Sequence, residues 1–271
     1  MTTRVALVGG TGKLGGIIAG VIEEHPDFEI SAILGSSSDL SDLDGADLVV
    51  DASTPAVSID IVRAAIERGL NVLVGTSGWS AERIALVRPL VDAAGTGALF
   101  IPNFSMGSVI GSALAAASAP FFPSIEIVEA HRETKVDSPS GTAVRTAELI
   151  AAARTSAGPV EAPHVDQRAR GQQIASVPVH SLRRPGVIAR QETILSGPGE
   201  ALTIVHDTID PAAAYAPGIR LALAAARDLR GVVLGLDALI DIGIRVPDAS
   251  LPTPPDPDRA VPGQVAHATG A

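Results

Sequence analysis

The sequence contains no cysteine and only two lysines among its 271 residues. Without thiols the chain forms no disulfide, no thiolate zinc site and no cysteine nucleophile, and this composition fits a reducing compartment. Aromatic residues make up 3% of the chain against 46% for all hydrophobic residues, so the core must be built from Ala, Val, Ile and Leu. Acidic residues outnumber basic ones by 30 to 20, and the formal net charge of −10 argues against a general nucleic-acid surface.

Long apolar runs are missing as well. None approaches the ~20 residues that span a membrane. The first residues, MTTRVALVGG, lead straight into a strand-like run without the basic and apolar pattern of a signal segment. We therefore expect a cytoplasmic protein whose partners are neither membranes nor nucleic acids.

Strand-like runs alternate with helical patterns over the first 104 residues. The expected strands are 4–9, 28–34, 47–53, 71–77 and 98–105, and the expected helices are 14–25, 56–69 and 80–95, the last with Ser80 as N-cap. This alternation predicts parallel βαβ units in an α/β, Rossmann-like doubly wound sheet. We assign residues 1–104 to this domain and expect the chain to return to it at about 212–245, through a helix at 212–229 and the segment 235–243.

The pattern changes near residue 105. Helices are expected at 107–119 and 142–154, and strands at 124–131, 174–183, 186–196 and 200–208. The short turns between the last runs favour antiparallel pairing, so residues 105–211 are predicted to form an α+β domain with a mixed, largely antiparallel sheet. Residues 246–271 hold six of the twenty prolines and little apolar content, which predicts a disordered tail.

A glycine-rich loop lies between the first strand and the first helix, with the spacing Gly9-x-x-Gly12-x-x-Gly15. Gly9 permits a tight turn, Gly12 lets the backbone approach a pyrophosphate, and Gly15 allows close packing of helix on sheet. Lys13 places a positive charge at the helix start, where the helix dipole disfavours it unless an anion is bound. The loop predicts a dinucleotide site, and the alternative is a turn that only connects strand to helix.

A second unusual segment is EAHRETKVDSPSGTA, residues 129–143, which holds the other lysine. His131, Arg132 and Lys135 lie where the strand 124–131 ends. Basic side chains beside a helix N-terminus form a site for an anion, most simply a carboxylate. Histidine exchanges protons near neutral pH and lysine can act as a proton donor, so the segment is a candidate for acid–base chemistry.

The helix in this segment is expected to begin with Ser138 as N-cap and Pro139 at its first position. The residues alone leave a plainer alternative open. Glu133 could pair with its basic neighbours in a solvated turn, and the segment would then have no ligand.

The same segment resembles the signature of the dihydrodipicolinate reductase (4-hydroxy-tetrahydrodipicolinate reductase) family. Further motifs follow the family in the same order over about residues 4–245. They are the glycine loop, VVDASTP (49–55), VGTSGW (74–79), IPNFSMG (101–107), PVHSLRRPGVIARQE (178–192) and GPGEALTIVHD (197–207). Several ordered motifs make this resemblance much more specific than a glycine loop alone.

The resemblance implies an enzyme of lysine and diaminopimelate biosynthesis that uses NADH or NADPH to reduce a cyclic dicarboxylate, 4-hydroxy-tetrahydrodipicolinate. It implies a catalytic acid–base His131, a proton-donating Lys135, and a substrate carboxylate held by Gly141 and Thr142. The implied cofactor residues are Gly9, Gly10, Thr11, Gly12, Lys13 and Leu14 at the pyrophosphate, and Gly75, Thr76, Ser77, Ile101, Pro102, Asn103 and Phe104 around the nicotinamide half. It also implies that the second domain binds substrate and builds a homotetramer through its sheet.

Three positions depart from the family pattern. Arg132 replaces a second, substrate-binding histidine, and arginine can hold a carboxylate with two hydrogen bonds. Ala52-Ser53 replaces Phe-Thr. Gly35 replaces an acidic ribose ligand, which leaves the choice between NADH and NADPH open. An amino-acid or amine dehydrogenase on the same scaffold and a non-catalytic dinucleotide sensor therefore remain alternatives.

The remaining histidines are assigned no role in the chemistry. His206 and His180 lie in strand-like runs, where a structural role is expected. No group of His, Asp and Glu has the spacing of metal ligands, so no metal is expected.

Overall fold

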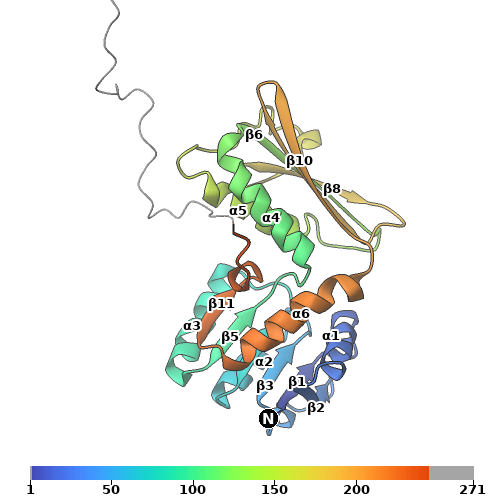
Figure 1. The fold of residues 1–271 in the computed structure, drawn as a ribbon, viewed down its shortest axis with the longest axis vertical. Helices are drawn as coiled ribbons and strands as arrows, with labels where there is room; N and C mark the ends of the chain where they lie inside the picture. Colours follow the sequence, from blue (N-terminus) through green and yellow to red (C-terminus); the bar gives the residue numbers. More distant parts are fainter. Residues whose placement is uncertain (1, 244–271) are drawn as a thin grey trace, which may run out of the picture.

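The computed structural model describes residues 2–243, and the predicted disordered tail at 246–271 lies outside the described residues. The described chain forms two β-sheets with helices packed on them, and the long helix α6 runs below the second sheet and across the first (Figure 1). Within the described range, no helix combines the length and the apolar character that crossing a lipid bilayer requires.

The first sheet has six parallel strands in the order β2-β1-β3-β4-β5-β11. Its strands are β1 (Thr3–Val8), β2 (Phe28–Leu34), β3 (Leu48–Asp51), β4 (Asn71–Val74), β5 (Gly97–Phe100) and β11 (Gly231–Leu234). This parallel order with helices on both faces confirms the predicted Rossmann-like sheet. The predicted strand 98–105 is shorter in the structure, because the chain leaves the sheet after Phe100.

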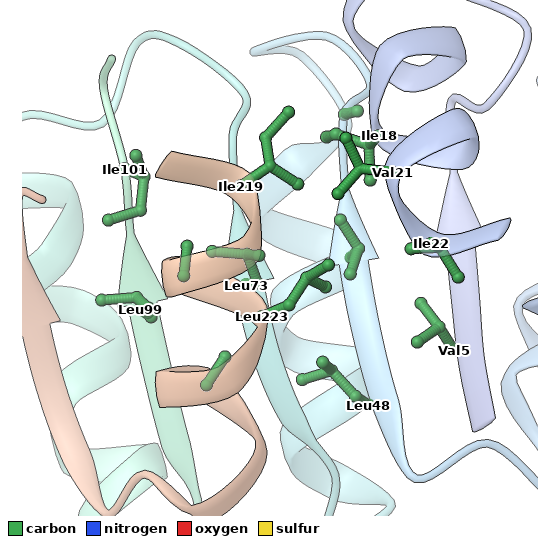
Figure 2. Close-up of a cluster of buried hydrophobic side chains, with 14 of the residues drawn as sticks. Val5, Ile18, Val21, Ile22, Leu48, Leu73, Leu99, Ile101, Ile219 and Leu223 are labelled. Atoms are coloured by element: carbon green, nitrogen blue, oxygen red, sulfur yellow. The ribbon is translucent and has the colours of Figure 1, made fainter. Parts of the chain in front are cut away.

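Two pairs of helices bury this sheet. Helices α1 (Lys13–Glu23) and α6 (Pro211–Asp228) cover one face, and α2 (Ser58–Glu67) and α3 (Ala81–Ala94) cover the other. Successive strand residues point to opposite faces, so Leu73 packs toward α6 while Val72 and Val74 pack toward α2 and α3. In Figure 2, Ile219 and Leu223 of α6 lie over Leu73 and its neighbours. Each such buried side chain contributes ~2 kcal/mol through removal of apolar surface from water.

A buried asparagine helps to hold the returning chain on the first sheet. The Asn71 side-chain amide donates to the carbonyl oxygens of Ala226, Arg227 and Leu229 at 2.9, 2.9 and 3.0 Å, where α6 ends. Its carbonyl oxygen accepts a hydrogen bond of 2.7 Å from the Gly97 backbone N–H. Helix α6 packs on the first sheet and β11 joins its edge, a strand at 231–234 that the sequence did not predict.

The second sheet is mixed, in the order β10-β9-β6-β8-β7, with β6 and β8 parallel and the other pairs antiparallel. Its strands are β6 (Ser124–His131), β7 (Gln172–Ile174), β8 (Val177–Arg183), β9 (Ala189–Gly197) and β10 (Glu200–Thr208). Helices α4 (Met106–Ser118) and α5 (Gly141–Ala153) cover one face. The pairing confirms the predicted mixed sheet, although the single run expected at 174–183 is divided by a turn at Ala175 and Ser176, both with positive φ.

Helix starts follow the expected chemistry at one site and differ at another. The Ser80 side chain accepts a hydrogen bond from the Arg83 backbone N–H, so the predicted N-cap of α3 is confirmed. The prediction of Ser138 as the N-cap of α5 is wrong. Ser140 takes that position and accepts from the Ala143 N–H at 3.3 Å, because Pro139 and Ser138 belong to the preceding loop. Short 3₁₀ turns complete the chain at η1 (Leu40–Leu43), η2 (Ala119–Phe121), η3 (Arg168–Arg170) and η4 (Asp237–Leu239).

Two adjacent glycines of α1 provide a matched test of the loop that precedes it. A Cβ on Gly15 would lie 2.1 Å from the Gly9 carbonyl oxygen, whereas a Cβ on Gly16 would meet no atom within 4 Å. We expect Gly15→Ala to lower the free energy of unfolding by at least ~2 kcal/mol through overpacking. Gly16→Ala should raise it by roughly 0.5–1 kcal/mol through helix propensity. Denaturant unfolding of both variants is the measurement, and equal effects would contradict the close contact of helix and loop.

Candidate active site

The glycine loop follows β1 at the point where the strand order reverses, since β2 lies on one side of β1 and β3 on the other. In open parallel sheets, ligands bind outside the carboxyl ends of the strands at such a point. Gly9 has a φ of +81°, and a Cβ on it would lie 2.4 Å from the Ala52 carbonyl oxygen. Gly12 is the N-cap of α1 and provides no side-chain hydrogen bond, and the first turn carries no acidic residue. The first-turn N–H groups are thus left for an external anion, so the loop fits a pyrophosphate.

A cavity of about 660 Å³ extends from this loop to the second sheet. Most of the residues predicted from the sequence line it: Lys13, Leu14, Gly75, Ser77, Pro102, Asn103, Phe104, His131, Arg132, Lys135, Gly141 and Thr142. The others do not line it. Gly9, Gly10, Thr11 and Gly12 form the turn before α1, while the side chains of Thr76 and Ile101 are buried. The structure therefore brings the predicted basic residues and part of the predicted dinucleotide segments to one cavity.

His131, the last residue of β6, is held by a buried carboxylate. Its Nδ1 lies 2.6 Å from Oε2 of Glu129, a residue that is fully buried. Burial alone would raise the pKa of Glu129, but hydrogen bonds from His131 and Arg183 outweigh burial and lower that pKa to about 2. An ionised carboxylate only accepts hydrogen bonds, so Nδ1 of His131 carries a proton. The other ring nitrogen, Nε2, is then the one available to a ligand.

The same carboxylate also fixes the loop that follows His131. Arg183 of β8 donates to both oxygens of Glu129 at 3.0 Å, and its guanidinium donates further to the backbone oxygens of Lys135 and Asp137 at 3.2 and 2.6 Å. The backbone N–H of Ser140 donates to Oε1 of Glu129 at 3.2 Å. One ion pair therefore links the histidine, the lysine loop and the start of α5.

The start of α5 completes the cavity on this side. Gly141 and Thr142 occupy its first turn, which contains no acidic residue. A Cβ on Gly141 would meet no atom within 4 Å, so the backbone there is open to the cavity. The arrangement is again that of an anion site at a helix N-terminus, with basic side chains beside it.

Positive charge in the cavity is unevenly neutralised. Lys135 Nζ lies 2.7 and 2.8 Å from the two carboxylate oxygens of Asp137, a pairing that the sequence did not predict. Over residues 2–243, by contrast, Lys13 and Arg132 take part in no ion pair. A protein of net charge −10 thus presents two uncompensated cations to one cavity.

A structural role was expected for His206 from the sequence, and the structure places this residue in the cavity wall. Its Nε2 lies 3.2 Å from the hydroxyl of Ser105, the N-cap of α4. Burial lowers the pKa of His206, which favours a neutral ring. The two-residue period of a strand could have indicated this position, because Ile204 and His206 share the face of β10 that looks toward α4.

The same period could have identified Glu129, which precedes His131 by two residues in β6 and shares its face. Arg183 could not have been found in that way, because it comes from another strand. In the part of the chain that the structure describes, no cluster of three or more His, Asp or Glu side chains is placed to hold a metal ion.

The lowered pKa of Glu129 predicts a specific loss of stability in acid. Its carboxyl has an ordinary pKa of 4.5 in the unfolded chain and about 2 in the folded one. Stability from this group is therefore present above about pH 4.5 and is lost as the pH falls toward 2, and we expect a contribution of about 3 kcal/mol. Glu129→Gln should be less stable than the parent at neutral pH and should lack this part of the acid slope. Denaturant unfolding across this pH range measures the free energy of unfolding of both proteins. The same dependence on pH in the parent and in Glu129→Gln would contradict the lowered pKa of Glu129.

Two family models match this chain, one over the residues of the first sheet's N-terminal part and one over most of the rest. A family model described as "Dihydrodipicolinate reductase, N-terminus" matches residues 3–104, and one described as "Dihydrodipicolinate reductase, C-terminus" matches residues 107–240. The 4-hydroxy-tetrahydrodipicolinate reductase of Clavibacter michiganensis is 52% identical over 278 residues, covering 100% of both chains. That of Streptomyces coelicolor is 40% identical and covers 88% of this chain and 98% of its own.

Solved structures match the fold over most of the chain. The dipicolinate-bound dihydrodipicolinate reductase from Paenisporosarcina sp. TG-14 is 26% identical, has a TM-score of 0.73, and covers 89% of this chain and 100% of its own. An amine dehydrogenase from Mycobacterium smegmatis is 12% identical with a TM-score of 0.60, covering 91% of this chain and 98% of its own, and shares the fold alone. With both family models matched over nearly all of residues 3–240, this chain belongs to the dihydrodipicolinate reductase family.

Proposed function

We propose that this protein converts 4-hydroxy-tetrahydrodipicolinate to tetrahydrodipicolinate in lysine and diaminopimelate biosynthesis. The 4-hydroxyl leaves as water, and NADH or NADPH and one proton reduce the double bond that results. The observation that carries the proposal is one shared cavity, lined by the basic residues of the segment 131–135, by the start of α5 and by the first residues of α1. This cavity offers a dinucleotide and a small dianion adjoining positions. A relative named 4-hydroxy-tetrahydrodipicolinate reductase, which covers the whole chain, supports it.

The dinucleotide is held by the glycine loop in this proposal. The open first turn of α1 and Lys13 bind the pyrophosphate, and the segments 75–77 and 101–104 surround the nicotinamide half. No carboxylate is positioned for the ribose directly after β2. The nearest acid downstream, Asp39, instead accepts a hydrogen bond of 2.8 Å from the Ser41 N–H and caps η1. NADH and NADPH are both compatible with such a site.

The dicarboxylate is held by the other half of the cavity. Arg132 can bind one carboxylate with two hydrogen bonds, and the backbone N–H groups at Gly141 and Thr142 can bind the other. Lys135 is paired with Asp137 in this structure, so a substrate carboxylate would compete for the same ammonium. These contacts orient the ring and polarise its double bond toward reduction.

The chemistry that a bound reduced nicotinamide supplies is hydride donation to carbon. The chain's own residues handle the proton that balances it. Lys135 donates a proton to the anion that forms, and His131 acts as the acid–base partner through Nε2, since Glu129 keeps its Nδ1 protonated. Arg132 and the start of α5 stabilise the negative charge of the substrate throughout.

A cytoplasmic homotetramer is part of the same proposal. Helices α4 and α5 cover only one face of the second sheet within the described chain. The opposite face carries Leu182 and Val205, which are 45% and 48% exposed. Association through this face would remove apolar surface from water and protect the edge of the sheet.

The test is NADH and NADPH oxidation, followed by absorbance, with freshly generated cyclic substrate. Lys135→Ala should lower turnover by ~100-fold or more, because the proton donor is lost. Lys13→Ala, which removes the chain's other lysine, should act mainly on the KM for the dinucleotide. Near-normal turnover in Lys135→Ala would remove the lysine from the chemistry. Oxidation of an amino acid without reduction of the cyclic substrate would favour the dehydrogenase alternative, and binding without turnover would favour the sensor.

Arg132 is tested by its effect on substrate affinity. Arg132→Ala should raise the KM for the dicarboxylate by roughly 10–100-fold with a smaller change in kcat, because a charged hydrogen-bond donor is lost. The KM of Arg132→Lys should lie between those of the parent and Arg132→Ala, since an ammonium keeps the charge but cannot form two parallel hydrogen bonds to a carboxylate. Arg88→Ala, on the exposed surface of α3, controls for the loss of one arginine. An unchanged KM in Arg132→Ala would place Arg132 outside the substrate site.

A further inference from the structure

Asn103 connects the two halves of the cavity through its side-chain amide. It follows β5 in the loop that leads to α4, between Pro102 and Phe104, and all three line the cavity. Its Nδ2 donates to the Thr142 hydroxyl oxygen at 3.1 Å and to the Ser108 hydroxyl oxygen at 3.0 Å. The loop between β5 and α4, on the dinucleotide side, is thus hydrogen-bonded to the first turn of α5.

The orientation of this amide follows from its third hydrogen bond. Oδ1 of Asn103 accepts from the backbone N–H of Ser105 at 2.8 Å, and a backbone N–H can only donate. The oxygen must therefore face Ser105, and the NH₂ group must face Thr142. The reversed amide would place two donors against each other.

This orientation determines what the Thr142 hydroxyl can do. A hydroxyl has one proton to donate, and Asn103 occupies a lone pair of this one. Within residues 2–243 the Thr142 hydroxyl donates its own proton to no protein group, since the bond from Asn103 is its one hydrogen bond. Thr142 lines the cavity, so that proton is available to an acceptor there.

We propose that Asn103 is a positioning residue that fixes the Thr142 hydroxyl as a hydrogen-bond donor to a substrate carboxylate, and that it couples dicarboxylate binding to dinucleotide binding. The proposal rests on the function proposed above. A dinucleotide that orders the loop 101–104 also orders Asn103, and Asn103 sets the hydroxyl before the carboxylate arrives. Such coupling is reciprocal, so the dicarboxylate strengthens dinucleotide binding by the same factor.

The test measures binding rather than turnover, on the full chain, with dipicolinate as the dicarboxylate probe. Calorimetric titration gives the dipicolinate Kd with and without saturating NADH, for the parent, Asn103→Ala, Thr142→Val and the double variant. Each single variant should weaken dipicolinate binding to the NADH-loaded protein by roughly 10-fold or more. The double variant should be no weaker than the weaker single one, because both remove the same contact.

Coupling is read from the same data. NADH should tighten dipicolinate binding in the parent, and this ratio should approach one in Asn103→Ala. Thr142→Ser retains the hydroxyl and should keep the parent affinity within about threefold, which separates the loss of the donor from a disturbed helix start. Thermal unfolding of each variant confirms that it is folded, and Thr142→Val alone still tests the donor if Asn103→Ala does not fold.

Additive effects of Asn103→Ala and Thr142→Val would overturn the proposal, since Asn103 would then act independently of the hydroxyl. A coupling ratio unchanged by Asn103→Ala would overturn it as well. Failure of the parent protein to bind dipicolinate and to oxidise NADH with the cyclic substrate would instead reject the proposed function, and this inference with it.

Discussion

The carboxylate of Glu129 is fully buried, and four hydrogen bonds from three separate segments meet on it. A buried charge is costly unless it is paired and its remaining lone pairs are satisfied, and here Arg183 supplies the opposite charge with two parallel bonds. Removal of Arg183 would leave the buried carboxylate without its counter-charge. The geometry of His131, of the loop to Lys135 and of the Ser140 cap therefore depends on one ion pair, which fixes the ligand half of the cavity before any ligand arrives.

Each half of the cavity has a helix N-terminus that can bind an anion, but the chain enters the two helices differently. On one side, the parallel sheet ends at a glycine loop, and the open N-terminus of α1 supplies N–H groups. On the other, a strand ends at His131 and the open N-terminus of α5 supplies them. Net charge explains why both are needed: a chain with ten excess negative charges repels a dianion at long range, so attraction must come from local cations and helix ends.

Much of this arrangement could be read from the sequence, because it depends on local patterns. Strands β6 and β10 lie at the predicted residues, and Lys13, which follows the glycine loop, lines one cavity with the basic segment. What escaped the sequence depends on contacts between distant segments. Strand β11 has four residues and follows a helix closely, and it is fixed by pairing with β5. The Glu129–Arg183 pair joins residues 54 positions apart, which no local period reveals.

The loop 132–140 is a second place where contacts with a distant segment decide what the local sequence does not. From the sequence, pairing of the basic residues with Glu133 was one alternative and Ser138 was the expected N-cap, yet Lys135 is paired with Asp137 and Ser140 is the N-cap. Arg183 binds the backbone oxygens of Lys135 and Asp137 and so fixes this loop from a distant strand. The ammonium of Lys135 is then kept beside a carboxylate while the cavity is open to solvent. Carboxylates compete for the same donor, so a bound dianion can replace Asp137 at the Lys135 ammonium. The lysine then keeps a charged partner throughout, which lowers the free-energy cost of transferring it from solvent into a closed site.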